Sequence, residues 1–110
     1  MTEQILMAYI RQVARELDLA IYHTRDSRGS DPGFPDLLIV GKTGIFRELK
    51  PDEGDLRWHQ RRWFRVLRVA GYSCEIWRPR DWQSGRIRRE LEILTPPAPP
   101  VQLDLFEEAA

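Results

Sequence analysis

Residues 33–50 read GFPDLLIVGKTGIFRELK, and this stretch decides the fold. The apolar run after Asp36 predicts a buried strand, GKTG at 41–44 predicts a turn, and the apolar residues that follow predict a return strand. On the return strand Glu48 and Lys50 are two residues apart, so their side chains project from the same face. Asp36 begins the first strand, level with the end of the second. Two carboxylates and one amine are therefore expected at one corner of a β-hairpin.

The register of this hairpin decides whether Asp36 reaches the other two side chains. If a loop of two or four residues joins the strands, Asp36 lies opposite Leu49 and faces the wrong side of the sheet. A β-bulge, or departure of the chain from the ladder at Pro35 and Asp36, would turn the carboxylate back. We therefore predict one of these two distortions.

The residue types at this corner point to phosphodiester chemistry. Two carboxylates at one point repel each other unless a cation lies between them, and their hard oxygens favour Mg²⁺ or Mn²⁺ over softer metals. Such an ion holds a phosphate oxygen, polarises phosphorus and supplies hydroxide near neutral pH. The ammonium of Lys50 can orient the attacking water or offset the charge that grows on the phosphate.

Pro35-Asp36, followed by Glu48-Leu49-Lys50, has the form of the PD-(D/E)xK nuclease signature. These two short motifs occur together by chance, but here they stand within a longer ordered set. That set closely resembles the VRR-NUC family of phage and repair nucleases, over roughly residues 3 to 94. Its segments are YHTRDS at 22–27, GFPDL at 33–37, GDL at 54–56, Gln60, Trp63, AGY at 70–72 and IWRP at 76–79.

The resemblance implies a role for each matching residue. Asp36 and Glu48, with the backbone carbonyl of Leu49, are expected to bind the metal. Lys50 is expected to be the catalytic lysine, and Gln60 the helix glutamine beside the site. The resemblance also implies a restriction-endonuclease-like α/β core, a small mixed sheet flanked by helices. It further implies Mg²⁺ or Mn²⁺ as cofactor and branched DNA, such as four-way junctions, as substrate. A homodimer would pair two sites to cut opposing strands.

Glu3 matches an acidic residue that some members of the family place on the first helix, where it would be a further metal ligand. The alternative is a first-turn charge that the helix dipole favours. Thr2 is expected to cap this helix over residues 3–17, and a short strand is expected at 19–23. The polar loop that follows has two interpretations: its arginines contact DNA phosphates, or it is a solvated loop that only connects two strands. The candidates are Arg25 and Arg28.

Asp55 is expected to cap a second helix over residues 56–70, ended by Gly71. Gln60 lies on its apolar face, and because an inward amide needs a partner, we expect it to contact the carboxylate cluster. A second stripe of this helix consists of arginines with few acids nearby. We interpret it as a surface for DNA phosphates rather than as a solvated helix face. Its members are Arg57, Arg61, Arg65 and Arg68.

The chain of 110 residues is long enough for one compact domain. Its formal net charge is +0, from 17 basic and 17 acidic residues, which by itself argues against a nucleic-acid partner. The distribution argues otherwise. Residues 56–89 contain ten arginines and only two acids, Glu75 and Asp81, whereas from Glu90 onward there are five acids and no base. The basic half is suited to phosphates, and arginine forms forked contacts with them.

Cys74 is the single cysteine, so an internal disulfide and a zinc site built on several cysteines are excluded. It lies in an apolar run and is expected to be a small core residue. No signal peptide is recognisable, and no apolar stretch approaches the ~20 residues that span a bilayer. We therefore expect a cytoplasmic protein of a bacterial or phage-infected cell, without a membrane partner.

A further strand is expected at 72–77, and a short basic helix from a cap at Asp81 to near Leu94. The expected order is thus helix, strand, hairpin, helix, strand, short helix, tail, with the nuclease-like domain over residues 1–94. Three of the four tryptophans, Trp58, Trp77 and Trp82, are of a kind that more often makes core or dimer contacts than platforms for bases, and the sequence does not separate these interpretations.

After this domain the composition changes. Residues 95–101 form a proline-rich linker, which is expected to be stiff and extended, and residues 102–110 form a tail. The segment QLDLF at 102–106 resembles the pentapeptide by which bacterial DNA-processing proteins dock onto the β sliding clamp. The alternative is a tail without a partner, or one that packs on its own domain. The residues assigned to clamp binding are Gln102, Leu103, Leu105 and Phe106.

Taken together, these features predict a metal-dependent DNA endonuclease. The main alternative from another class is a catalytically inactive DNA- or clamp-binding accessory module, which has no chemical need for Asp36, Glu48 and Lys50 together. A second alternative is a restriction-type nuclease that reads sequence. Such an enzyme usually needs a larger recognition region than this short chain can provide.

Overall fold

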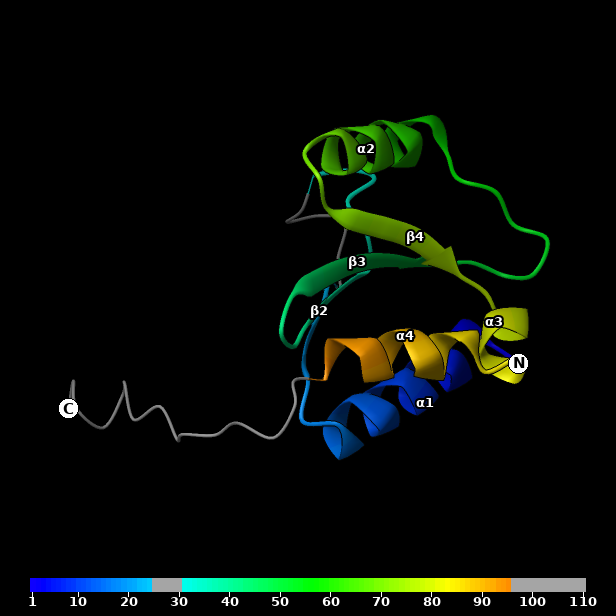
Figure 1. Cartoon of the computed structure of the whole chain (residues 1–110). Helices are drawn as coiled ribbons and strands as arrows, with labels where there is room; N and C mark the ends of the chain where they lie inside the picture. Colours follow the sequence, from blue (N-terminus) through cyan, green and yellow to red (C-terminus); the bar gives the residue numbers. More distant parts are fainter. Residues whose placement is uncertain (25–30, 96–110) are drawn as a thin grey trace, which may run out of the picture.

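The structure is a computed structural model that describes residues 1–24 and 31–95. The helices and strands in chain order are α1 (Glu3–Glu16), β1 (Ala20–His23), β2 (Leu37–Val40), β3 (Gly44–Leu49), α2 (Trp58–Val69), β4 (Ser73–Trp77), α3 (Pro79–Gln83) and α4 (Arg86–Leu94). The strands form one sheet in the order β1-β2-β3-β4. The sheet lies between α2 on one face and α1 and α4 on the other (Figure 1).

The sheet is mixed, as the sequence predicts. β1 pairs antiparallel with β2, and β2 with β3, whereas β3 and β4 run parallel. Parallel neighbours need a crossover connection, and α2 provides it between the end of β3 and the start of β4. The predicted α/β fold, a small mixed sheet flanked by helices, is therefore confirmed. The observed order adds one short helix, α3, to the expected series.

Side chains that alternate along the strands supply two apolar layers. The larger layer lies against α1 and α4, and it encloses Trp77, which is 0% exposed. On the other face, Phe64 and Leu67 of α2 pack against Cys74 of β4. Burial of Cys74 confirms its predicted place in the core. Buried members of the larger layer include Leu6, Ile10, Val13, Leu37, Ile39, Ile87 and Leu91.

The first helix begins as predicted, because Thr2 Oγ1 accepts a hydrogen bond from the Ile5 N–H at 3.1 Å. The predicted start of the second helix was wrong. α2 begins at Trp58, two residues after the expected start, and Asp55 does not cap it. Instead, Gln60 Oε1 accepts a hydrogen bond from the Arg57 N–H at 2.8 Å, so the cap comes from inside the helix.

The predicted basic helix that starts at Asp81 is in fact two helices. Pro79 occupies the first turn of α3, where its fixed φ suits a helix start, so Asp81 lies inside the helix. There Asp81 Oδ2 accepts a hydrogen bond from the Arg78 N–H at 2.8 Å. Gly85, at a φ of 83°, then separates α3 from α4. No helix in the described part of the chain combines the length and apolarity needed to cross a bilayer.

The hairpin closes through three residues, 41–43, because Val40 pairs with Gly44. Continued past its last pair, Leu37 with Arg47, this register places Asp36 opposite Glu48 rather than Leu49. The expected misplacement of Asp36 was therefore wrong, since it assumed a loop one residue shorter or longer. The chain does leave the β2–β3 ladder at Asp36, as predicted, but both carboxylates are already on the face that α2 covers.

Candidate active site

Asp36 stands where β2 separates from β3. Its Oδ2 accepts a hydrogen bond from the Leu49 N–H at 2.9 Å. Its backbone carbonyl accepts another from the Thr24 N–H at 2.8 Å. The residue is thus held by β3 through its side chain and by the continuation of β1 through its backbone. These two bonds fix the carboxylate at the end of β3.

Glu48 is the buried carboxyl of the site, with a residue exposure of 4%. Its Oε2 accepts a hydrogen bond from Gln60 Nε2 at 3.1 Å. Its Oε1 is buried and has no hydrogen-bond partner within residues 1–24 and 31–95. Burial, and after it the charge of Asp36, raises the pKa of Glu48 to about 8, while Lys50 opposes the shift. The β2–β3 register, continued past Leu37 and Arg47, places Asp36 opposite Glu48, so the two carboxyl groups lie at the same corner of the hairpin.

Lys50 follows β3 directly and extends its pairing with β4, because the Lys50 N–H donates to the Trp77 carbonyl at 3.1 Å. Its Nζ lies 3.9 Å from Glu48 Oε2, and its side chain is 15% exposed. An ammonium has three donors, so it can contact Glu48 and a substrate oxygen at the same time. The structure therefore brings the amine to the carboxylate corner, as expected from the alternation along β3.

Gln60 joins α2 to the corner through both ends of its amide. The Oε1 atom caps the helix at the Arg57 N–H, and the Nε2 atom donates to Glu48. The inward amide therefore finds its partner in the carboxylate cluster, as predicted. Its orientation is fixed as well, since only the carbonyl oxygen can accept from a backbone N–H and only the nitrogen can donate to a carboxylate.

Gly33 sets the distance between the hairpin and α2. It has a φ of 86°, and a Cβ at this position would lie 2.5 Å from the backbone carbon and oxygen of His59 and 2.7 Å from the Gln60 nitrogen. Only glycine fits this conformation and this close approach. The segment that carries Asp36 is therefore seated on the first turn of α2, beside the residue that contacts Glu48.

Glu3, in the first turn of α1, lies close enough to the corner to be affected by it. Burial, and then the charge of Asp36, raises the pKa of Glu3, whereas His23 and Lys50 lower it. The sequence left open a ligand role and a first-turn charge for this residue. Within residues 1–24 and 31–95 Glu3 does not form a group of three with Asp36 and Glu48 that could hold a metal ion, so the ligand role stays a proposal.

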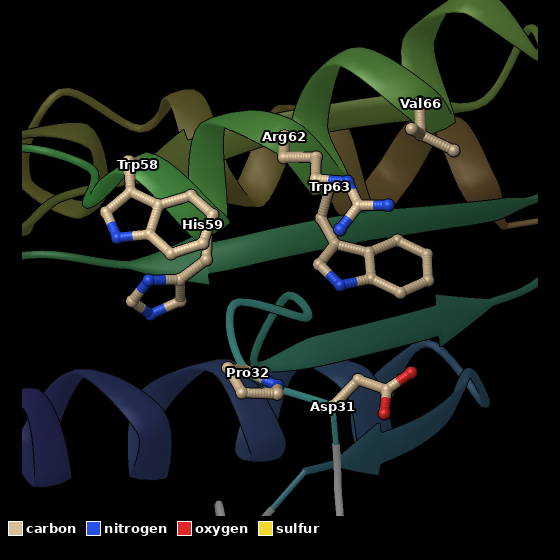
Figure 2. Close-up of a pocket in the computed structure, with 7 residues that line it drawn as sticks. All are labelled: Asp31, Pro32, Trp58, His59, Arg62, Trp63 and Val66. Atoms are coloured by element: carbon tan, nitrogen blue, oxygen red, sulfur yellow. The ribbon is translucent and has the colours of Figure 1, made fainter.

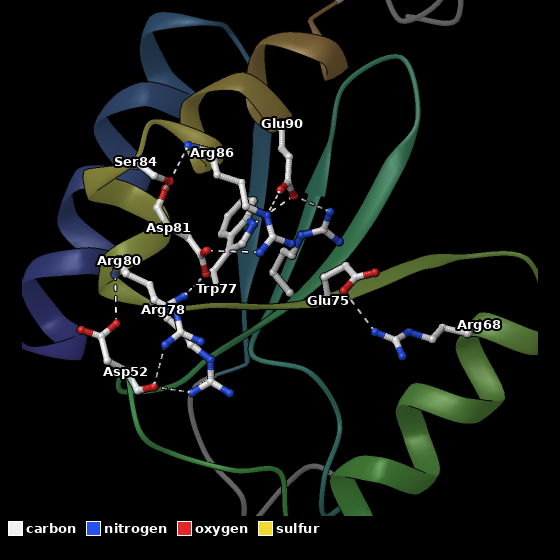
Figure 3. A network of polar contacts seen from close by, with 11 residues as sticks. Asp52, Arg68, Glu75, Trp77, Arg78, Arg80, Asp81, Ser84, Arg86 and Glu90 are labelled. Atoms are coloured by element: carbon white, nitrogen blue, oxygen red, sulfur yellow. Dashed lines mark hydrogen bonds and ion pairs between the residues drawn. The ribbon is translucent and has the colours of Figure 1, made fainter.

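Arg78 is a positioning residue that the sequence reasoning did not single out, although it lies within the matched IWRP segment. Its Nη1 donates to the carbonyls of Pro51 and Gly54, both at 2.6 Å, and so holds the loop between Lys50 and α2. Asp52 Oδ1 in the same loop accepts from the Arg80 N–H at 3.0 Å (Figure 3). A single arginine thereby ties the chain that leaves the candidate catalytic lysine to the end of β4.

A partly buried ion pair supports the strand that carries Glu48. Arg47 Nη2 lies 2.8 Å from Glu90 Oε1, and Trp77 Nε1 donates to the same oxygen at 3.1 Å. Burial opposes ionisation of Glu90, but the hydrogen bonds from Arg47 and Trp77 lower its pKa overall. No sequence pattern marks this pair, because Arg47 and Glu90 lie 43 residues apart in the chain.

The predicted arginine stripe on α2 is divided in the structure. Arg57, Arg61 and Arg65 are exposed. Arg68 is instead tied to β4, because its Nε donates to the Cys74 carbonyl at 2.8 Å and its Nη2 lies 3.1 Å from Glu75. The phosphate role of all four residues stays a prediction. The other predicted contacts lie outside the described residues, namely Arg25, Arg28 and the tail residues Gln102, Leu103, Leu105 and Phe106.

The carboxylate pair fits a hard divalent cation. In residues 1–24 and 31–95 no group of three or more His, Cys, Asp or Glu side chains is arranged to hold a metal ion. Asp36 and Glu48 form a pair, and a pair suits Mg²⁺, which is usually held by one or two carboxylates together with waters and substrate phosphates. The buried Glu48 oxygen without a partner is a lone ligand atom that a cation would satisfy.

Fold and corner together define a small α/β domain with a carboxylate pair, a lysine and a glutamine at the end of a hairpin. No protein-family model matches the sequence, and no curated protein matches it. Among solved structures, one described as a VRR_NUC domain protein has a similar fold, with a TM-score of 0.64. The match covers 84% of this chain and 90% of that chain, at 18% sequence identity. The likeness agrees with the predicted α/β fold, a small mixed sheet flanked by helices.

Proposed function

We propose that this protein is a metal-dependent nuclease that hydrolyses phosphodiester bonds in DNA. The observation that carries the proposal is the convergence of Asp36, Glu48, Lys50 and Gln60 at one corner, with a buried Glu48 oxygen left without a partner in the described part of the chain. Similarity to the fold of a VRR_NUC domain protein supports it. The wider sequence resemblance to the VRR-NUC family points to the same reaction.

Each residue of the corner has a separate task in this proposal. Asp36 and Glu48, with the backbone carbonyl of Leu49, would hold a Mg²⁺ or Mn²⁺ ion, and Glu3 is a further candidate. When bound, the ion would polarise the phosphate and activate a water molecule. Gln60 holds the Glu48 carboxylate in place through the bond at 3.1 Å. The ammonium of Lys50 orients the water or offsets the charge that develops on the phosphate oxygens.

The finer parts of the proposal concern substrate and assembly. The resemblance suggests branched DNA, including four-way junctions, and a homodimer that presents two sites to opposing strands. The exposed arginines of α2 would follow the phosphate backbone without reading sequence, since contacts of this kind position the protein but carry no base information. The arginines lie on the helix that also supplies Gln60, so bound DNA would pass close to the corner.

An inactive accessory module is the main competing function. A module that only binds DNA does not need to bury a carboxyl beside a second carboxyl, which costs free energy unless a cation or a proton compensates it. That arrangement favours the enzyme. A restriction-type nuclease remains the alternative within enzymes, and the choice of substrates in the test separates it from a structure-specific one.

The decisive experiment is incubation of the protein with labelled four-way junction, flap, linear duplex and single-stranded DNA, in Mg²⁺, in Mn²⁺ or in EDTA. We expect the protein to cut DNA only when the divalent ion is present. Asp36→Asn and Lys50→Ala should each reduce the cutting rate by about a thousandfold or more. Lys42→Ala is the matched control, because it removes an exposed lysine at the opposite end of the same hairpin. Cutting that persists in EDTA, or in folded Asp36→Asn protein, would reject the mechanism.

A further inference from the structure

A pocket with one aromatic wall lies on α2, the helix that also supplies Gln60. Its volume is about 450 Å³, within the range of small-molecule sites. Helix α2 supplies one wall and the short segment before Gly33 supplies the other (Figure 2). The residues on which its chemistry depends are Asp31, Pro32, Trp58, His59, Arg62 and Trp63.

The two tryptophans of the pocket are held differently. Trp63 is half-buried and is supported by Phe34, whose ring meets it edge to face at 5.0 Å between centroids. Trp58 is 75% exposed, which is unusual for so large an apolar side chain, and it packs edge to face with His59 at 5.3 Å. Trp58 therefore does not serve the core, contrary to one of the interpretations of the tryptophans drawn from the sequence. Its ring offers an accessible aromatic face.

The charges of the pocket favour an anionic ligand with an aromatic part. Arg62 is exposed and projects into the pocket beside Trp63 (Figure 2). Helix α2 carries four arginines and no acid over Trp58–Val69. Asp31 is the acidic side chain among the lining residues, and it lies on the opposite wall, where it can accept a hydrogen bond from an amino group. A nucleotide combines these features, since it has a flat base with donor groups and a negative phosphate.

The pocket and the carboxylate corner share their structural supports. Trp58 and His59 directly precede Gln60, whose amide contacts Glu48. On the other wall, Pro32 directly precedes Gly33, which seats the chain before Asp36 on α2. The corner and Trp58 therefore both lie at the first turn of α2, where a DNA strand bound at the corner would meet the pocket.

We infer that the pocket binds an unpaired nucleobase of the DNA strand, stacked on Trp58 and Trp63, with Arg62 on an adjacent phosphate. A base inside a duplex is stacked on both faces and cannot offer its ring to a tryptophan, so the ligand is a base from a single-stranded segment or a branch point. This inference rests on the proposed function and deepens it, because it names the part of a branched substrate that the protein recognises. Stacking tolerates every base, so no sequence preference is required.

The test is a binding measurement in EDTA, so that it does not depend on cleavage. Fluorescently labelled blunt duplex and the same duplex with a short single-stranded overhang are titrated with native protein and three variants. Trp58→Ala removes the stacking face, Trp58→Phe keeps an aromatic ring, and Val69→Ala is a control on the same helix. Val69 is 80% exposed and does not line the pocket.

We expect native protein to prefer the overhang, and Trp58→Ala to reduce that preference by about tenfold, in keeping with the loss of one stacked base. Trp58→Phe should retain most of the preference and Val69→Ala all of it. Equal affinity of native protein for the two DNAs, or an unchanged preference in folded Trp58→Ala protein, overturns the inference. Because binding is measured without metal, this result is separate from a failure of the nuclease proposal, which would appear as absence of cutting.

Discussion

Glu48 is the residue whose energetics depend most on pH. Burial, reinforced by Asp36, raises its pKa to about 8 from the value of 4.5 that an ordinary glutamate has. The folded protein therefore keeps this carboxyl protonated over a pH range in which the unfolded chain releases the proton. Its contribution to stability is fully present below the unfolded pKa and is lost as the pH rises through the folded pKa. In the absence of metal, the fold should weaken between these two values.

We predict that Glu48→Gln, which stays neutral, raises the free energy of unfolding of the metal-free protein on the order of 4 kcal/mol at about pH 8 but only on the order of 1 kcal/mol at about pH 5. Urea unfolding in EDTA at both pH values measures the difference. Glu92→Gln, an exposed position on α4, is the control and should have no such effect. A stabilisation of equal size at both pH values would contradict the assignment of the shift to Glu48.

Metal binding should also depend on the ionisation of Glu48. A carboxyl must lose its proton to bind a cation, so affinity for Mn²⁺ should rise by about tenfold per pH unit until the pKa of Glu48 is passed. Thermal unfolding with increasing Mn²⁺ should give a higher Tm for native protein, and the gain should be larger at about pH 8 than at about pH 6. Asp36→Asn should abolish the gain. A Tm gain that is independent of pH would argue that the ion binds elsewhere.

For single residues, the sequence predicted which side chains share a face, but it did not predict all of their hydrogen bonds. The alternation of Glu48 and Lys50 along one strand, and the inward amide of Gln60, follow from periodicity alone. The position of Asp36 does not, because it depends on a loop of three residues rather than two or four. The role of Arg78 was also hidden, since its acceptors are backbone carbonyls of a distant loop, which no residue pattern marks.

Helix α2 is the element that joins the proposed chemistry to the proposed DNA surface. Gln60 at its first turn contacts Glu48, while Arg61 and Arg65 are exposed along its length. Exposed arginines without nearby acids are available to phosphates, and each phosphate contact releases condensed counterions. The helix therefore should contribute to the affinity for DNA of any sequence.

We predict that Arg61→Ala combined with Arg65→Ala weakens binding to all DNA sequences alike. The slope of log affinity against log salt concentration should become less steep by about two, one unit for each lost phosphate contact. The matched control is Arg88→Ala with Arg89→Ala, which removes the same charge from α4 on the opposite face of the sheet. An unchanged salt slope in the α2 variant would show that these arginines do not contact phosphates and only form a solvated helix face.

The elements themselves were predictable because each has a strong periodic pattern, and the errors lie at their ends. Asp55 is a good cap by residue type, but the helix starts later because the Gln60 side chain satisfies the Arg57 N–H. The last helix was expected as one short basic helix from a cap at Asp81 to near Leu94. Gly85 in a left-handed conformation interrupts it, and a conformation of this kind is visible only in the structure.

In the whole molecule, the helices that bury the core and the residues of the proposed active site lie on opposite faces of the sheet. Helices α1 and α4 cover one face of the sheet and α2 covers the other (Figure 1). The first face buries most of the apolar core, whereas the second carries the carboxylate corner, and α2 also lines the aromatic pocket. This division explains why a net charge of +0 is misleading. Charge matters for DNA only where a surface presents it, and α2 presents arginines without acids.

The last prediction concerns residues 101–108, which lie outside the described part of the chain. We propose that their QLDLF segment docks onto a bacterial β sliding clamp and thereby brings the proposed nuclease to DNA. Leu105 and Phe106 would enter an apolar pocket and Gln102 would bond at its rim. The two apolar side chains contribute ~3–6 kcal/mol before the cost of ordering the peptide, so the peptide alone should bind weakly.

A peptide of residues 101–108 should therefore bind purified clamp in a fluorescence anisotropy titration, and the same peptide with Leu105→Ala and Phe106→Ala should not. In the full protein, affinity for clamp loaded on DNA should exceed that of the peptide, because both partners are held on one DNA and the second contact is intramolecular. Equal binding of the two peptides, or none by the native one, would remove the docking proposal. The nuclease proposal would be unaffected, since Asp36, Glu48, Lys50 and Gln60 all lie in residues 1–94 and form the corner without the tail.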